Sequence, residues 1–168
     1  MTSKPLYAKL SPAQWDVAES ARTVVAAGAD GVSLVNTIRG LALDPHTLAP
    51  RLAHGAGGYS GPALKPIALA CVYACATAVD VPIVGMGGVA SGLDALEVVA
   101  AGATAVALGT VLFTDPFAPE RIRAELAREA SARGFGEPGD ARAASVVQIE
   151  KPLHMATNSS GCTAREDC

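Results

Sequence analysis

The chain has 168 residues, of which half are hydrophobic, and its formal net charge is −3. This length and composition exclude disorder for most of the chain and suffice for one sizeable core. The weakly acidic charge and the lack of a basic run argue against nucleic acid or an anionic membrane surface as a partner. A small anionic ligand needs only a local positive potential and stays open.

No stretch of the sequence predicts membrane insertion. The longest apolar run, residues 67–79, is shorter than the ~20 residues that cross a bilayer, and the N-terminal Met-Thr-Ser-Lys-Pro lacks the apolar region of a signal peptide. We therefore expect a soluble, cytoplasmic protein.

The four cysteines do not predict a metal site. Cys71 and Cys75 lie four residues apart in an apolar helical run, and Cys162 and Cys168 lie in the polar C-terminal segment. Neither pair has the spacing of a zinc site or of a redox Cys-x-x-Cys motif. We expect the first pair to be buried thiols on a helix, as free cysteines commonly are.

The first third of the chain predicts a strand, a helix and a second strand. Residues 6–10 form a short apolar run, and apolar residues recur at helical spacing in residues 13–27. Residues 31–37 read as a buried strand. Residues 38–61 are rich in Gly and Pro and are expected to be irregular, and loops of this length are often functional and close over a ligand.

The later part of the chain repeats the alternation of helices and strands. Residues 63–78 are apolar on nearly every side and predict a buried helix. Residues 82–110 predict a strand, a glycine turn, a helix and another strand, and the helix is expected to point Asp94 and Glu97 into solvent. Residues 120–133 predict a charged helix.

An internal repeat supports a parallel sheet. Residues 27–37 and 101–110 both have Ala-Gly-Ala at a helix end and then a buried strand. Four near-continuous hydrophobic strands separated by helices predict an α/β fold. Residues 1–133 are predicted to form this domain, and residues 134–168, where periodicity fades, a flexible tail.

Small and polar residues gather at the predicted carboxyl ends of the strands, which is where such folds bind ligands. They are Lys9, Asn36, Thr37, Gly87, Gly88, Gly109 and Thr110. The two pairs that follow the last strands predict clusters of backbone donors for a phosphate. Ordinary turns after strands would have the same residues.

Three side chains suggest the rest of the ligand. A lysine in an apolar strand, Lys9, needs an anionic or electron-rich partner such as a flavin ring, unless it reaches solvent at the strand end. Asn36 has two donors and an acceptor in one plane, which suits a ligand with amide-like edges, and Thr37 adds a hydroxyl. Both residues could instead cap the next turn.

Five motifs in order resemble the C-terminal half of class 1 dihydroorotate dehydrogenases, most closely the class 1B catalytic subunit. They are Pro-Leu-Tyr-Ala-Lys-Leu-Ser-Pro from residue 5, Gly-Ala-Asp-Gly-Val-Ser-Leu-Val-Asn-Thr from residue 28, Gly-Gly-Tyr-Ser-Gly-Pro-Ala-Leu-Lys-Pro from residue 57, Gly-Met-Gly-Gly-Val from residue 85 and Ala-Leu-Gly-Thr from residue 107. The resemblance implies strands 5 to 8 of a (β/α)8 TIM barrel, and it covers residues 4–128.

The resemblance also implies a cofactor, a substrate and a role for each candidate residue. The cofactor is FMN, the substrate is dihydroorotate, and the reaction of pyrimidine (UMP) biosynthesis moves a proton from C5 and a hydride from C6 to give orotate. Electrons then pass to an iron-sulfur and FAD subunit. By resemblance, FMN is bound by Lys9, Val35, Gly61, Gly87, Gly88, Gly109 and Thr110. The substrate is bound by Asn36 and Thr37.

The family's catalytic base, a cysteine in class 1, belongs to the N-terminal half of the barrel and has no counterpart in this sequence. The catalytic residue is therefore unknown here, and the resemblance predicts either a partner chain with the N-terminal half or self-association to cover open sheet edges. Two alternatives are a flavin barrel of the dihydropyrimidine dehydrogenase type and an inactive remnant with weak FMN or phosphate binding.

Overall fold

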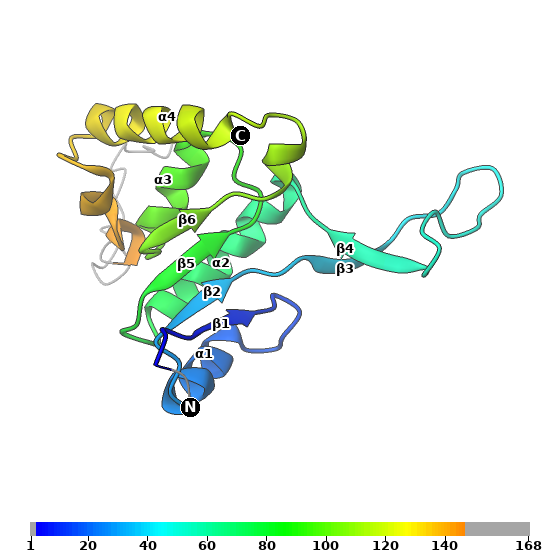
Figure 1. The fold of residues 1–168 in the computed structure, drawn as a ribbon, viewed down its shortest axis with the longest axis horizontal. Coiled ribbons are helices and arrows are strands. Elements are labelled where there is room, and N and C mark those ends of the chain that lie inside the picture. Colours follow the sequence, from blue (N-terminus) through cyan, green and yellow to red (C-terminus); the bar gives the residue numbers. More distant parts are fainter. Residues whose placement is uncertain (1–2, 147–168) are drawn as a thin grey trace, which may run out of the picture.

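The main sheet has four parallel strands in the order of the chain. The computed structural model describes residues 3–146. Its strands are β1 (Tyr7–Leu10), β2 (Gly31–Leu34), β5 (Ile83–Met86) and β6 (Ala105–Ala107), each paired in parallel with the next (Figure 1). All four predicted strands are confirmed, although β2 ends three residues earlier than predicted.

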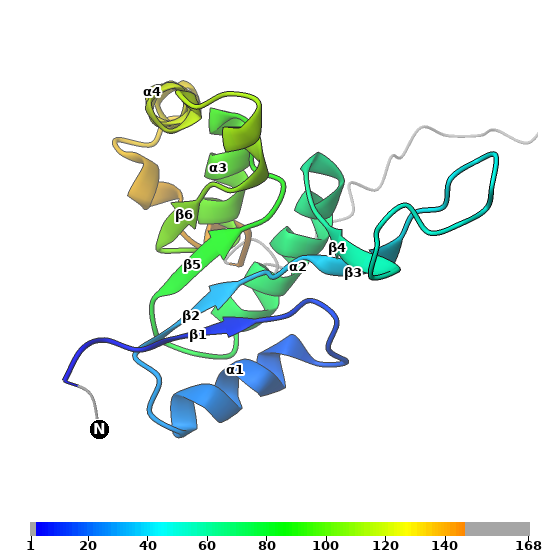
Figure 2. The same cartoon turned by 45° about the vertical axis from the view of Figure 1, so that its right-hand side comes forward.

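Helices follow the strands and form one layer. They are α1 (Val17–Ala26), α2 (Lys65–Ala76), α3 (Gly92–Ala100) and α4 (Ala118–Ala132). Right-handed crossovers between strands in sequential order place every connecting helix on the same face of the sheet. Accordingly α1 packs on α2, α2 on α3 and α3 on α4 (Figure 2). A sequential order without reversal is typical of a barrel rather than of a doubly wound sheet.

The helix boundaries follow from local capping. The Asp16 side chain accepts a hydrogen bond from the Glu19 N–H (2.9 Å) and caps the start of α1, so Trp15 lies before the observed helix and is fully exposed. At the other end, Gly28 has a φ of +99°, which continues the chain in a left-handed conformation. The predicted helix at residues 13–27 is therefore correct in type but starts four residues too early.

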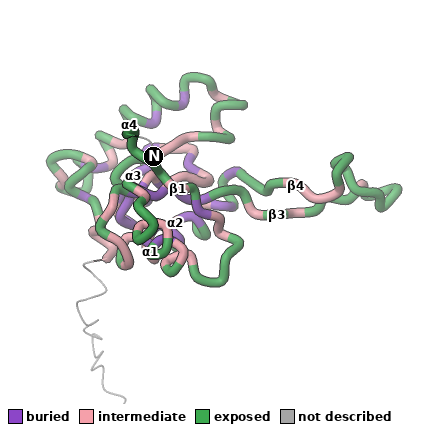
Figure 3. Tube along the Cα trace, turned by 60° about the horizontal axis from the view of Figure 1, so that its bottom comes forward, coloured by how far each residue is buried: buried purple, intermediate pink, exposed green. Residues whose placement is uncertain are grey.

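The core lies between the sheet and the helical layer. Val32, Leu34 and Ile83 of the strands are completely or almost completely buried, as is Val98 of α3 (Figure 3). Gly85 lets α3 approach β5, because a Cβ atom there would lie 2.3 Å from Cγ1 of Val98. Burial of these branched side chains stabilises the fold by roughly 1.5–3 kcal/mol each, which makes the sheet and its helices one unit.

The segment expected to be irregular contains an antiparallel hairpin. Strands β3 (Ile38–Leu41) and β4 (Ala56–Tyr59) pair with Ile38 opposite Tyr59. The hairpin projects from the body of the molecule (Figures 1 and 3). The expectation of an irregular segment at residues 38–61 is wrong for these two strands, because β4, Ala-Gly-Gly-Tyr, has no alternation and no β-branched residue.

The packed part of the chain also extends past residue 133, the predicted end of the domain. Residues Pro138–Ala141 form a 3₁₀ turn, and Ala141 is buried against Leu96 and Val99 of α3. The Ser145 hydroxyl donates to the Ala100 carbonyl oxygen (2.9 Å). Residues 147–168 of the predicted tail lie outside the described residues. None of the helices within residues 3–146 has the length and apolar character needed to cross a bilayer.

Candidate functional site

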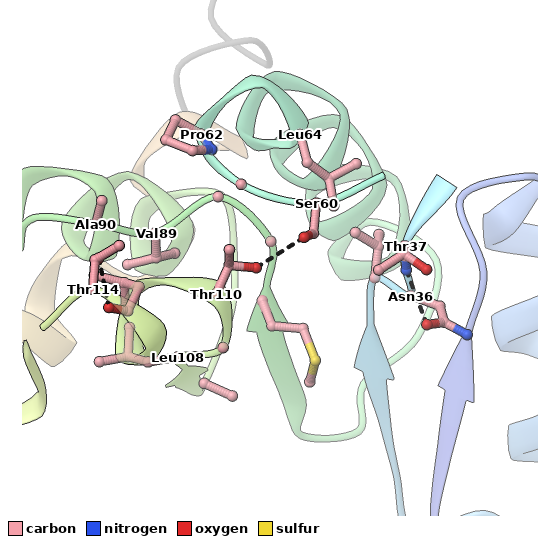
Figure 4. Close-up of a pocket in the computed structure, with 18 of the residues that line it drawn as sticks. Asn36, Thr37, Ser60, Pro62, Leu64, Val89, Ala90, Leu108, Thr110 and Thr114 are labelled. Atoms are coloured by element: carbon pink, nitrogen blue, oxygen red, sulfur yellow. Dashed lines mark hydrogen bonds between the residues drawn. The ribbon is translucent and has the colours of Figure 1, made fainter. Parts of the chain in front are cut away.

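A cavity of about 520 Å³ lies at the carboxyl ends of the four parallel strands (Figure 4). Its walls come from the strand ends and from the loops that follow them. It is lined by all nine residues predicted to bind cofactor or substrate: Lys9, Val35, Asn36, Thr37, Gly61, Gly87, Gly88, Gly109 and Thr110. Residues far apart in the chain thus meet at one place because the strands are parallel.

The loop after β5 depends on two glycines. Gly87 and Gly88 have φ values of +124° and +75°, which residues other than glycine rarely adopt. A Cβ atom on Gly88 would also lie 2.7 Å from the backbone N of Lys65 and 2.9 Å from the carbonyl O of Gly61. The glycines therefore let this loop dock directly on the start of α2, a role separate from ligand access.

Two other glycines face open space. A Cβ atom on Gly61 or on Gly109 would meet no heavy atom within 4 Å. Since both residues line the cavity, a ligand can approach their backbone closely. Between them, the Thr110 hydroxyl donates to the Ser60 hydroxyl (3.0 Å), which joins the loop after β4 to the loop after β6 (Figure 4).

Asn36 and Thr37 leave β2 at the opposite end of the cavity. The Asn36 N–H donates to the Leu10 carbonyl oxygen (3.1 Å), and the Asn36 side-chain oxygen accepts from the Thr37 N–H (2.9 Å) (Figure 4). Both side chains are exposed. The local turn contact considered from the sequence is thus present, and the amide NH₂ of Asn36 is the donor that a ligand could use.

Lys9 is the one ionisable residue among the described residues that line the cavity. Within residues 3–146, no group of three or more His, Cys, Asp or Glu is placed to hold a metal ion. Cys71 and Cys75 are buried in α2, and burial raises the pKa of Cys75 to about 11. They do not line the cavity and remain neutral thiols at ordinary pH.

A network beside the cavity was not predicted. Nζ of Lys65 lies 2.6 Å from Oδ1 of Asp94 and 2.7 Å from Oε2 of Glu97. The expectation that these carboxylates point into solvent is therefore wrong, because both are held by the lysine that begins α2. The missed pairing joins residues 29 and 32 positions apart, and no local pattern in the sequence marks such a distant contact.

The Asp94 carboxylate has further partners in the loop before α3. Its Oδ2 accepts from the N–H groups of Ala90 (3.0 Å) and Ser91 (2.9 Å) and from the Ser91 hydroxyl (2.8 Å). Burial acts to raise the pKa of Asp94, but the hydrogen bonds from Lys65, Ala90 and Ser91 together outweigh burial and lower it. The ionised carboxylate is thus the form that the fold stabilises.

Sequential parallel strands, one helical layer and a glycine-rich cavity at the carboxyl ends define a TIM-barrel-type α/β protein with a ligand site. The family model for dihydroorotate dehydrogenase matches residues 1–129. The chain therefore belongs to the dihydroorotate dehydrogenase family, which confirms the family predicted from the motifs.

Its relatives are longer than this chain. It is 52% identical over 116 residues to the dihydroorotate dehydrogenase B (NAD(+)) catalytic subunit of Alkaliphilus metalliredigens, covering 69% of this chain and 38% of that protein. It is 46% identical over 140 residues to the protein of the same name from Halalkalibacterium halodurans, covering 83% and 46%. The solved structure of DHODH from Eimeria tenella in complex with ferulenol has a TM-score of 0.72 and 28% identity, over 87% of this chain and 40% of that one. The chain thus spans less than half the length of these relatives.

The stability contributed by Asp94 is expected to be lost in acid. Because the pKa of Asp94 is lowered in the folded state, its contribution is fully present well above the ordinary value of 3.8 and is lost as the pH falls through the lower folded-state value. The difference in free energy of unfolding between the wild type and Asp94→Asn should therefore shrink below pH 3.8. Urea denaturation at a series of pH values measures it, and a difference that grows in acid would contradict the ion pair.

Proposed function

We propose that this chain forms the FMN-binding part of a dihydroorotate dehydrogenase, which oxidises dihydroorotate to orotate in pyrimidine (UMP) biosynthesis. The observation that carries the proposal is that all nine residues expected for cofactor and substrate line one cavity at the strand ends. Membership of the family and the names of the relatives support the same activity.

The cavity fits FMN in size and in chemistry. Its volume of about 520 Å³ lies within the range of roughly 300–1,000 Å³ that is usual for such ligands. Gly87 and Gly88 after β5, with Gly109 and Thr110 after β6, would hold the phosphate through backbone and hydroxyl donors. Lys9, Val35 and Gly61 would contact the flavin. Gly61 and Gly109 leave open the space that a ligand at the backbone requires.

Each polar side chain then has one task. Bound FMN would accept the hydride from C6 of dihydroorotate. The Lys9 ammonium would offset the negative charge that develops beside it, and the Asn36 amide and the Thr37 hydroxyl would orient the substrate. Removal of the C5 proton needs a base, and the described residues lining the cavity include no carboxylate, histidine or cysteine. By resemblance to the family, the base would belong to the N-terminal half of the barrel.

The same proposal extends to the barrel. Strands β1, β2, β5 and β6 would be strands 5 to 8, and residues 1–133 with the packed segment up to residue 146 would form half of the domain. In the complete enzyme, electrons would pass to an iron-sulfur and FAD subunit, as a catalytic subunit of the B type requires. A second candidate function is binding of FMN without redox chemistry. The observation in its favour is that the described lining residues include no base.

Thr110→Val tests the phosphate site. The substitution keeps the size of the side chain and removes its hydroxyl donor, so the FMN affinity should fall about tenfold. Quenching of flavin fluorescence on titration of the purified chain measures the affinity. Thr77→Val is the matched control, because it removes a hydroxyl at the C-terminal end of α2, away from the cavity. A wild-type chain that takes up no FMN would overturn the proposed cofactor, and an unchanged affinity in Thr110→Val would exclude this residue from the site.

Lys9→Met tests the flavin end of the cavity. Loss of the ammonium removes the charge that stabilises reduced, anionic flavin, so the reduction potential of bound FMN should fall, whereas Lys9→Arg should retain it. Spectroscopic titration with a reductant in the presence of a reference dye measures the potential. An equal potential in the wild type and in Lys9→Met would place Lys9 away from the flavin.

The two outer strands predict association. In the described part of the chain the sheet ends at β1 and β6. Exposed apolar residues lie in these two strands or close to them in the sequence: Leu6, Tyr7, Trp15, Leu112, Phe113 and Phe117. We expect the purified chain to self-associate or to bind a chain that supplies the first half of the barrel. Sedimentation at micromolar concentration checks this, and a monodisperse monomer that stays soluble alone would contradict it.

A further inference from the structure

Lys65 lies directly behind the proposed phosphate site, yet it does not line the cavity. We propose that Lys65 is a positioning residue, whose ion pair with Asp94 fixes the turn at Gly61 against the turn at Gly88 at the spacing that a phosphate group requires. The inference rests on the proposed binding of FMN and adds to it a residue that contacts neither cofactor nor substrate.

The position of Lys65 joins two loops. It is the first residue of α2 and follows the 3₁₀ turn Pro62–Leu64, which starts at Gly61. Its backbone N is so close to Gly88 that no side chain fits there. Its Nζ reaches the first and second turns of α3 at Asp94 and Glu97. One residue therefore ties the loop after β4 to the loop and helix after β5.

Asp94 extends this link into the glycine loop itself. While Oδ1 binds Lys65, Oδ2 holds the Ala90 and Ser91 N–H groups, only two and three residues after Gly88. The same carboxylate thus connects α2 to the loop that would hold the phosphate. The Lys65 and Asp94 side chains are 28% and 16% exposed, so water competes less for this pair than for a surface pair.

The loop is held from α4 on its other side. Oε2 of Glu125 accepts from the Gly92 N–H (2.8 Å), and Nη2 of Arg121 donates to the Ala90 carbonyl oxygen (3.3 Å). Without the Lys65 ammonium, Asp94 would still hold the Ala90 and Ser91 N–H groups, but the link from Asp94 to the start of α2 would be lost while the contacts with α4 remain. The loop could then shift away from Gly61 and widen the site between the two turns.

A direct contact between Lys65 and phosphate is the competing explanation. Two carboxylates already bind the ammonium group, and the hydrogen bond to Asp94 contributes most to raising the pKa of Lys65, which keeps it charged. The cluster of Lys65, Asp94 and Glu97 carries a net negative charge, so it does not attract an anion by itself. Attraction would come from backbone donors of the glycine turns.

Affinities for FMN and for riboflavin, which lacks the phosphate, separate these explanations. Lys65→Gln and Asp94→Asn should each weaken FMN binding about tenfold and change riboflavin binding less than about twofold, because only the phosphate end is disturbed. Lys65→Arg keeps the ion pair and should restore FMN affinity. Glu129→Gln, which removes an ion pair with Arg133 at the far end of α4, is the matched control and should bind both flavins as the wild type does.

Three outcomes would overturn the proposal. In the first, Asp94→Asn binds FMN as tightly as the wild type or more tightly. This result would show that Lys65, released from Asp94, binds the phosphate itself, or that the Asp94 carboxylate repels the phosphate. Equal losses of FMN and riboflavin affinity would show a general effect on stability. Unchanged amide hydrogen exchange at Ala90 and Ser91 in ligand-free Lys65→Gln would exclude the loop as the element held.

Amide exchange also separates this proposal from the proposed function. If the wild type binds FMN no better than riboflavin, the proposed phosphate site is contradicted. Exchange at Ala90 and Ser91, measured by NMR on ligand-free protein, still decides whether Lys65 fixes the loop, and faster exchange in Lys65→Gln is the supporting result.

Discussion

The parallel register of the four strands is the constraint on which the site depends. Leu10 lies opposite Leu34, Leu34 opposite Gly85 and Gly85 opposite Val106, so these four residues form one row across the sheet. In β2, β5 and β6 the lining of the cavity begins with the residue directly after this row. A register shift of one residue in any strand would turn its side chains to the other face and separate the lining residues.

Three glycines, which have no side chain, allow the close contacts that hold the loop after β5 next to its neighbours. Gly85 lets α3 reach β5, Gly88 lets its loop meet the start of α2, and a Cβ on Gly92 would lie 2.4 Å from the backbone of Glu125 in α4. These three contacts are between backbone and neighbour rather than between long side chains. The loop over residues 87–92 is consequently fixed by the helices around it, and its backbone keeps the orientation that the fold imposes.

The sequence predicted the parts of this arrangement that depend on local pattern. Buried strands and amphipathic helices have periodicity, and the candidate residues follow strands, so both were found before the structure. The hairpin was missed because Ala56–Tyr59 is mostly glycine and alanine. The Lys65–Asp94 pair and the burial of Ala141 were missed because they depend on contacts between distant parts of the chain, for which a lysine, an aspartate and an alanine on helices carry no local sign.

The distribution of charge gives the cavity a direction. Lys9 lies on β1 at one edge of the sheet, and Gly109 and Thr110 follow β6 at the other, three strand spacings or at most about 14 Å away along the sheet. The β1 end thus has the cation of Lys9 with the uncharged polar side chains of Asn36 and Thr37, and the β6 end has Gly109 and Thr110 with no charged side chain in the lining. A free phosphate ion would occupy only the second end. An extended ligand with an electron-rich ring and a terminal phosphate would use both ends, and this arrangement supports the proposed cofactor over a smaller anion.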